Sequence, residues 1–166
     1  MTSRAKTAQA SPFRIVAVTL DEGTLAKRGP EIEQEMKIAI HDLLEQNHFV
    51  PKDSPGGPFR LLLAIAENRL IFDIRLTDGL EHGRVILALA PFVRVLKQYR
   101  ELCASYYVAI REAPAARIEA IDMGRRGLHD EGAALLMERL GGKIAMDLAT
   151  ARQLFTLICA LSSKGA

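Results

Sequence analysis

The spacing of apolar residues along the chain changes between a period of two and a period of three to four, and these changes predict the order of the elements. A period of two, typical of strands, appears in residues 13–19, 60–66, 69–76 and 84–90. Turn-forming residues separate the last three of these segments, at Glu67–Asn68 and Asp78–Gly79. The three segments are therefore predicted to form an antiparallel meander, which a single N-terminal strand precedes.

The middle strand of the meander predicts how the two faces of the sheet are used. The apolar set, predicted to face the core, is Leu70, Phe72, Ile74 and Leu76. The polar set, predicted to face outward or toward an edge, is Arg69, Asp73 and Arg75. We therefore expect one packed face and one face that is at least partly wet.

Four further segments repeat with the helical period. The first begins at Pro30, which suits the first position of a helix, and its apolar stripe stops near Asn47. The second runs from Phe92 for about five turns. The third opens at Pro114 and the fourth begins after Asp147. The first is predicted to pack one apolar stripe inward, whereas the fourth, apolar over more than half its circumference, should be buried among the other helices or at a dimer contact.

The core-facing residues of the second helix follow from its spacing of three and four. They are Phe92, Leu96, Tyr99, Cys103, Tyr106 and Ile110.

Shorter features complete the predicted order of elements. Gly141 and Gly142 are predicted to end the third helix, and Lys143–Met146 to add a short extended segment. Asp21 and Glu22 are expected to cap a short helical turn that runs toward Lys27.

Strands and helices segregate along the chain, and this predicts an α+β fold. The expected architecture is a small antiparallel sheet, made of the N-terminal strand and the meander, packed against about four helices. Residues 13–166 should form one globular domain, and residues 1–12, which are small and polar, should form a disordered tail.

The composition is that of one ordinary globular domain, and the apolar runs of the sequence indicate in which cellular compartment the protein lies. The chain has 166 residues, of which 49% are hydrophobic and 25% charged. Its longest apolar run, Val85–Val93, is far shorter than the roughly 20 residues that cross a bilayer. The N-terminus lacks the apolar stretch of a signal peptide. We therefore expect a cytoplasmic protein with no membrane segment.

Charge argues against nucleic acid as a partner. The formal net charge of +2 comes from 22 basic and 20 acidic residues that are mixed along the chain. An RNA-binding interpretation would have to rely on one helix face, which carries Arg94, Lys97, Arg100 and Arg111. A solvated helix face explains these four residues as well.

Metal, cofactor and thiol chemistry receive little support from the residue pattern. His41, Glu45 and His48 share helical spacing, but a zinc site would need a fourth ligand, so we interpret them as surface residues. Cys103 and Cys159 fall in apolar helical patterns, where cysteine packs as a small hydrophobe. Neither a phosphate-binding loop nor a dinucleotide fingerprint occurs. We predict no metal site and no cofactor.

The residues Asp122, Arg125, Arg126 and His129 form the candidate ligand-binding site. In a continuous helix, Asp122, Arg126 and His129 share one face, and Arg125 lies one turn from His129. Two guanidinium groups suit a phosphate or a carboxylate, and a histidine beside a carboxylate can titrate near neutral pH. Gly124 and Gly127 each weaken the helix by about 1 kcal/mol, so a kinked pair of helices is the alternative.

A structural role competes with ligand binding for the same residues. In this interpretation the arginines pair with Asp122, Asp130 or Glu131 and hold a helix junction together. We weigh this explanation above ligand binding.

Several strings in the chain resemble a known family. They are VTLDE near the start, SYYVAIR at 105–111, EAIDMGRRGLHDEGAALL at 119–136 and ATARQLFTLICAL at 149–161. Together they resemble a bacterial family of uncharacterised proteins, family 0262, over residues 13–161. The resemblance implies a single cytoplasmic bacterial domain, and it assigns no role to Arg125, Arg126 or His129.

Two functional hypotheses from different classes follow from the sequence. The first is a non-enzymatic interaction or regulatory module that assembles as a homo-oligomer or binds a protein partner, because the helices carry more apolar surface than a small sheet can cover. The alternative is an enzyme or binding protein for a phosphorylated or carboxylated small molecule. In it Arg125 and Arg126 would hold the anion and His129 would act as general acid or base.

Overall fold

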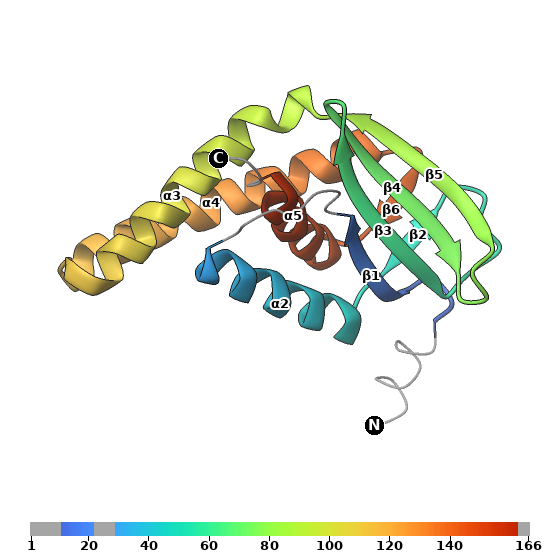
Figure 1. Ribbon diagram of the computed structural model, residues 1–166, viewed down its shortest axis with the longest axis horizontal. Coiled ribbons are helices and arrows are strands. Elements are labelled where there is room, and N and C mark those ends of the chain that lie inside the picture. Colours follow the sequence, from blue (N-terminus) through green and yellow to red (C-terminus); the bar gives the residue numbers. More distant parts are fainter. Residues whose placement is uncertain (1–10, 22–28, 163–166) are drawn as a thin grey trace.

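The computed structural model describes residues 11–21 and 29–162, which form four α-helices and two sheets. Figure 1 shows the helices gathered beside the larger sheet, with α3 and α4 extending away from it. In chain order the elements are β1 (Ile15–Asp21), α2 (Pro30–Glu45), β2 (Phe49–Pro51), β3 (Phe59–Ala66), β4 (Arg69–Leu76), β5 (Glu81–Ala88), a 3₁₀ turn (Ala90–Phe92), α3 (Val93–Glu112), α4 (Ala115–Leu140), β6 (Ile144–Met146) and α5 (Leu148–Ser162). The predicted α+β class with four helices is confirmed.

The larger sheet has the strand order β1-β3-β4-β5. β3, β4 and β5 form the predicted antiparallel meander. β1, however, runs parallel to β3, with Ile15 opposite Phe59 and Leu20 opposite Leu63, so the sheet is mixed and not antiparallel throughout. A parallel pair needs a long crossover, and α2 with β2 provides it here.

A second sheet consists of two strands of three residues each, β2 and β6, which pair antiparallel. The extended segment predicted at Lys143–Met146 is confirmed as β6. Its partner, Phe49–Pro51, was not expected, because three residues are too few to show a strand period. This small sheet packs toward β3 through the rings of Phe49 and Phe59, whose centroids lie 5.8 Å apart.

One helix, α4, runs without interruption through Gly124 and Gly127, so the continuous alternative is correct and the kinked pair is wrong. The helix crosses α5 at Gly132. A Cβ atom added at Gly132 would lie 2.2 Å from Cζ of Phe155, whose side chain is fully buried. Glycine is therefore required here by the close approach of an aromatic ring and not by backbone conformation.

The core lies between the inner face of the sheet and the helices. Leu70, Phe72 and Ile74 of β4 are buried as predicted. Asp73 points to the opposite face and was expected to be wet, yet it is only 3% exposed. Arg75 and Arg84 reach over it, with Nη2 atoms 3.4 and 3.5 Å from Oδ2. Its Oδ1 has no hydrogen-bond partner among the described residues.

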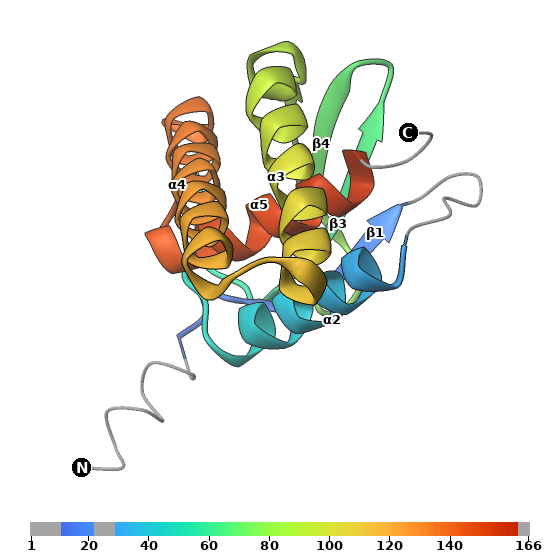
Figure 2. The same cartoon turned by 90° about the vertical axis from the view of Figure 1, so that its left-hand side faces the viewer.

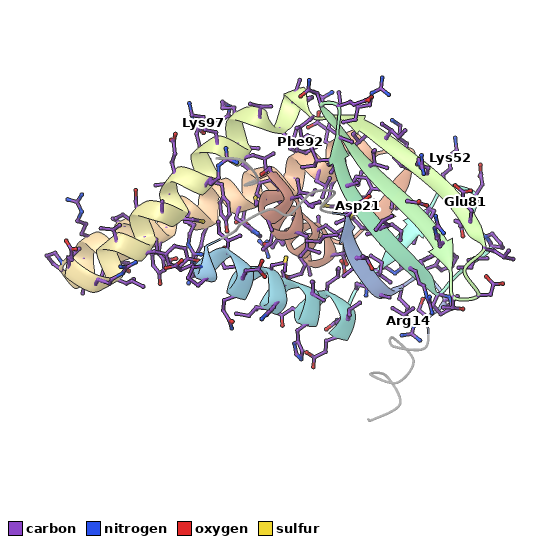
Figure 3. The ribbon with its side chains drawn as sticks, viewed as in Figure 1. Arg14, Asp21, Lys52, Glu81, Phe92 and Lys97 are labelled. Carbon is purple, nitrogen blue, oxygen red and sulfur yellow. The ribbon has the colours of Figure 1, made fainter. Side chains whose placement is uncertain are left out.

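The helices α3 and α4 form a hairpin whose turn lies at the end of the molecule away from the sheet (Figures 1 and 2). Where α3 leaves the sheet, Phe92 is fully buried, whereas Lys97 is exposed (Figure 3). The inward stripe predicted for this helix holds through Cys103. It fails at Ile110, which is 48% exposed because the end of the hairpin extends beyond α2 and α5 (Figure 1).

The ends of the chain complete the description. Residues 1–10 of the tail predicted over residues 1–12, and the helical turn predicted after Asp21, lie outside the described residues. The carbonyl of Pro12 accepts a hydrogen bond from the Gly57 amide. None of the helices in residues 11–21 and 29–162 is both long and apolar enough to cross a bilayer.

Candidate functional site

Arg125 bridges three helices. Its Nη2 and Nε atoms lie 2.7 and 3.2 Å from Oδ1 of Asp122 on the same helix, α4. Its Nη1 lies 3.3 Å from Oε1 of Glu35 on α2, and its guanidinium carbon lies 4.6 Å above the ring of Tyr106 on α3. The Tyr107 hydroxyl donates a second hydrogen bond to Glu35. Arg125 therefore holds α2, α3 and α4 in register.

Asp122 receives both arginines of the adjacent pair. Arg125 bonds Oδ1, and Nε of Arg126 lies 3.0 Å from Oδ2. The hydrogen bond from Arg125, with the charges of both guanidinium groups, holds the pKa of the Asp122 carboxyl below its ordinary value. Asp122 is thus a carboxylate at neutral pH and serves to orient the two arginines.

The two arginines differ in how much water they meet. The Arg125 side chain is 22% exposed and the Arg126 side chain 76% exposed. Arg126 contacts Asp122 through Nε, which leaves its two Nη nitrogens without a protein partner in the described part of the chain. Of the pair, Arg126 is the one that has donors to offer a ligand.

His129 is a half-buried histidine whose ring is already engaged. Its Nε2 lies 2.8 Å from the Thr156 hydroxyl, and that hydroxyl donates to the Arg152 carbonyl. With the hydroxyl proton directed at that carbonyl, the hydroxyl oxygen accepts from His129, and on this basis we assign the proton of the neutral ring to Nε2. Burial, assisted by the charges of Arg152 and Arg125, holds the pKa of His129 below its ordinary value. The imidazole is therefore neutral at pH 7.

These side chains surround an open pocket of about 480 Å³ between α3, α4 and α5. Its lining residues are Tyr99, Arg125, Arg126, His129, Asp130 and Arg152. Arg152 bonds Asp130, with Nε 2.9 Å from Oδ1. The lining therefore carries three guanidinium groups and one carboxylate, and the Asp122 and Glu35 carboxylates that pair with Arg125 and Arg126 lie behind it. We call this cavity the arginine pocket.

The four predicted site residues do come together, though not in equal roles. Arg125, Arg126 and His129 line the arginine pocket, while Asp122 lies behind the two arginines and holds them. Sequence reasoning missed Arg152. A signal was present, because Arg152 is the single charged residue of α5, a helix that is otherwise strongly apolar.

The structural pairing considered from sequence is present in part. Arg125 and Arg126 both pair with Asp122, as that interpretation required. Asp130 pairs with Arg152 and Glu131 with Arg94, so neither acidic residue is engaged by the adjacent arginines. The partner of Arg125 that sequence reasoning did not name is Glu35 on α2.

Other candidate residues are placed as follows. His41, Asp42 and Glu45 bring possible ligand atoms within 4.8 Å of one another on the exposed side of α2, and His48 does not join them. Burial raises the pKa of the Cys103 thiol to about 11, so this cysteine is protonated at neutral pH and a poor nucleophile. Of the helix-face cations, Arg94 bonds Gln98 and Glu131, and Arg100 bonds the Ser162 carbonyl.

Comparison with known proteins identifies relatives but no structural precedent. The model of the uncharacterised protein family UPF0262 matches residues 12–164. A UPF0262 protein of Nitrobacter winogradskyi is 56% identical over 155 residues, 93% of each chain. One of Bradyrhizobium sp. strain ORS 278 is 56% identical over 153 residues, 92% of this chain and 91% of its own. One of Rhodopseudomonas palustris strain TIE-1 is 55% identical over 152 residues, 92% of this chain and 93% of its own.

No solved structure matches the chain. The matches to the family model and to full-length bacterial relatives agree with the resemblance noted in the sequence, and they span every described element. On this evidence the chain belongs to the UPF0262 family.

Proposed function

We propose that this chain is a non-enzymatic binding module that holds a small phosphorylated or carboxylated molecule in the arginine pocket. The observation that supports this most strongly is that Arg126, a 76% exposed arginine of the pocket wall, keeps both Nη nitrogens without a partner among the described residues, beside Arg125 and Arg152. Arginine offers planar, permanently charged donors that match the oxygens of a phosphate or a carboxylate.

The contacts give the arginines different parts in this proposal. Arg126, with its free Nη nitrogens, and Arg152, from the facing helix α5, bind the anion from two sides. Arg125 is already occupied by Asp122 and Glu35, so it shapes the wall of the pocket and adds charge. Asp122 positions Arg126 by accepting a hydrogen bond from its Nε.

His129 enters the proposal as a hydrogen-bonding group of the pocket wall. A general base must present an unprotonated atom within hydrogen-bond reach of the reacting group. The Nε2 of His129 is engaged by Thr156, and its ring packs against the rings of Tyr99 and Phe155, with centroids 5.4 and 5.5 Å away. In the Nε2–H tautomer the unprotonated atom is Nδ1, and we assign it the role of accepting a hydrogen bond from the ligand.

Calorimetric titration with inorganic phosphate, small nucleotides and di- and tricarboxylates tests this proposal. The wild-type protein should bind at least one class with a dissociation constant in the micromolar to millimolar range. Arg126→Ala and Arg152→Ala should each weaken binding by about tenfold or more, as expected when a charged hydrogen bond of roughly 1.5–3 kcal/mol is lost.

Arg139→Ala is the matched control, because Arg139 is an exposed arginine of the same helix that does not line the pocket. It should bind as the wild type does. If no anion binds, or if the control variant loses affinity as much as the pocket variants, the proposal is wrong.

A second candidate function is self-association through the α3–α4 hairpin, which would make the chain a homo-oligomeric module. Three apolar side chains stand exposed near the end of the hairpin: Val108 at 55%, Ile110 at 48% and Met123 at 67%. Exposed apolar groups on a projecting element are typical of an interface. Light scattering coupled to gel filtration should show a dimer that Met123→Lys shifts toward monomer, whereas a monomeric wild-type protein at tens of micromolar would contradict it.

A further inference from the structure

A second cavity lies between α2 and α3. α2 packs mainly against α5 and β1, whereas α3 packs mainly against α4, so the two helices diverge. The space between them is a pocket of about 260 Å³, floored by α5. Most of its lining is apolar and includes Ile32 and Met36 from α2, Cys103 and Ala104 from α3, and Cys159 and Ala160 from α5. We call it the α2–α3 pocket.

The inner polar groups of this pocket are satisfied by the protein itself. Glu35, which lines the wall, accepts hydrogen bonds from the Tyr107 hydroxyl and from Arg125. The Thr156 hydroxyl bonds His129 and the Arg152 carbonyl. A ligand body entering this space therefore meets apolar surface and finds no buried polar group that it must satisfy.

The rim of the pocket carries positive charge. Arg111 lies 3.7 Å from Glu31, which offsets its charge. Arg100 donates through Nη1 to a neutral partner, the Ser162 carbonyl 2.9 Å away, and no described carboxylate pairs with it. Arg100 therefore leaves an uncompensated guanidinium beside an apolar cavity, a combination that suits a molecule with an apolar body and an anionic head.

We propose that the α2–α3 pocket binds a monocarboxylate with a short apolar body, which lies between α2 and α3 while its carboxylate pairs with Arg100. The volume of the pocket limits the length of the ligand's apolar body. A closed apolar cavity of about 150 Å³ holds benzene, so about 260 Å³ accommodates about ten non-hydrogen atoms, the size of octanoate. This site is separate from the arginine pocket, since Tyr99 and the Thr156–His129 pair lie between the two cavities.

A chain-length series on the wild-type protein tests the proposal directly. Calorimetric titration with straight-chain carboxylates from butanoate to dodecanoate should show affinity rising roughly three- to fourfold per methylene, the factor expected for burying one CH₂. The rise should stop near octanoate, where the pocket is full. Affinity that does not change with chain length, or that keeps rising through dodecanoate, would overturn the assignment.

Two variants and one analogue locate the ligand within the pocket. Ala104→Phe fills the cavity and should abolish binding, whereas Ala134→Phe, at an exposed alanine of α4 outside the pocket, should not. Arg100→Gln should weaken octanoate about tenfold while leaving the chain-length dependence unchanged. Octanol should bind more weakly than octanoate to the wild type. Equal affinities for the two, or undiminished binding by a folded Ala104→Phe variant, would contradict the proposal.

Discussion

The two halves of α4 are held in place by different forces. The C-terminal half contributes all the buried residues of the helix, Gly132, Ala133, Leu136 and Leu140, which pack against α5 and the core. In the N-terminal half each residue is at least partly exposed, and that half is attached to α2 and α3 through Arg125, Glu35 and Tyr106. The C-terminal half is therefore positioned by close packing of buried residues, and the N-terminal half by a cluster of polar side chains.

This difference explains where a binding site can form. Close packing leaves no room for a ligand and tolerates little change in side-chain volume. A helix held by charged side chains a turn apart leaves space between its neighbours, and the arginine pocket borders this half of α4 through Arg125 and Arg126. Substitutions in the two halves should therefore have effects of different size and kind.

Gly132→Ala should have the largest effect. The new Cβ would lie 2.2 Å from the fully buried ring of Phe155, which has no room to retreat. Overpacking of this kind costs about 3 kcal/mol, measurable as a lower midpoint of urea unfolding. Gly127→Ala is the control, since nothing lies within 4 Å of that position, and it should stabilise the helix by up to about 1 kcal/mol. Equal stability of the two variants would contradict the close contact.

Arg125→Ala should come second. It leaves the Asp122 and Glu35 carboxylates with one partner each, Arg126 and Tyr107. Because the pair is partly buried, the cost should be about 2 kcal/mol, or roughly 5 °C in melting temperature for a domain of this size. Arg125→Lys should recover little of the lost stability, because lysine lacks the forked guanidinium group that reaches both carboxylates. Differential scanning calorimetry measures both, and full rescue by lysine would argue against the bridging geometry.

A smaller effect should appear as a dependence of stability on pH. Burial lowers the native pKa of His129, so between its ordinary value of 6.5 and the lower native value the unfolded chain binds more protons than the folded one. The free energy of unfolding should therefore decrease as pH falls through that window. Asp122, whose native pKa is also lowered, loses its contribution only below about its ordinary value of 3.8.

His129→Gln separates the histidine from other titrating groups. Glutamine can still donate to the Thr156 hydroxyl but carries no proton that titrates. Its unfolding free energy should change less than that of the wild type between pH 6.5 and pH 5. Parallel curves for the two proteins would show that His129 is not the titrating group.

Arg126→Ala should have the smallest effect on stability. The side chain is 76% exposed and makes one contact, to Asp122, so its loss should change the free energy of unfolding by at most about 0.5 kcal/mol. Chemical denaturation in a buffer without polyvalent anions measures this. A loss as large as that of Arg125→Ala would mean that both arginines hold the helices together.

Local patterns predicted much of this architecture because neighbours in sequence determine them. The meander follows from period-two segments with turn formers between them, and α2 begins at Pro30 as expected. The direction of β1 was not predictable from its own residues, because it depends on where the crossover returns the chain to the sheet. The burial of Asp73 was missed for a similar reason, since Arg84 covers it from the adjacent strand.

The candidate site was predictable within α4 and not beyond it. Helical spacing brought Asp122, Arg125, Arg126 and His129 together. Glu35 lies 90 residues before Arg125, and Arg152 comes from another helix, so only the packing of α2 and α5 shows that these groups belong to the same region. The difference between Arg125 and Arg126 likewise depends on which one faces α2.

The central claim is that two adjacent arginines divide structural and binding roles, and thermal unfolding of Arg125→Ala and Arg126→Ala with and without a bound anion tests it most directly. The anion used should be the tightest binder found by calorimetry, at about a hundred times its dissociation constant, where binding to the folded state stabilises by about 2.7 kcal/mol. Arg125→Ala should melt several degrees lower without anion and keep part of the upward shift. Arg126→Ala should melt like the wild type without anion and lose most of the shift. Identical behaviour of the two variants, in either condition, would contradict the division of roles.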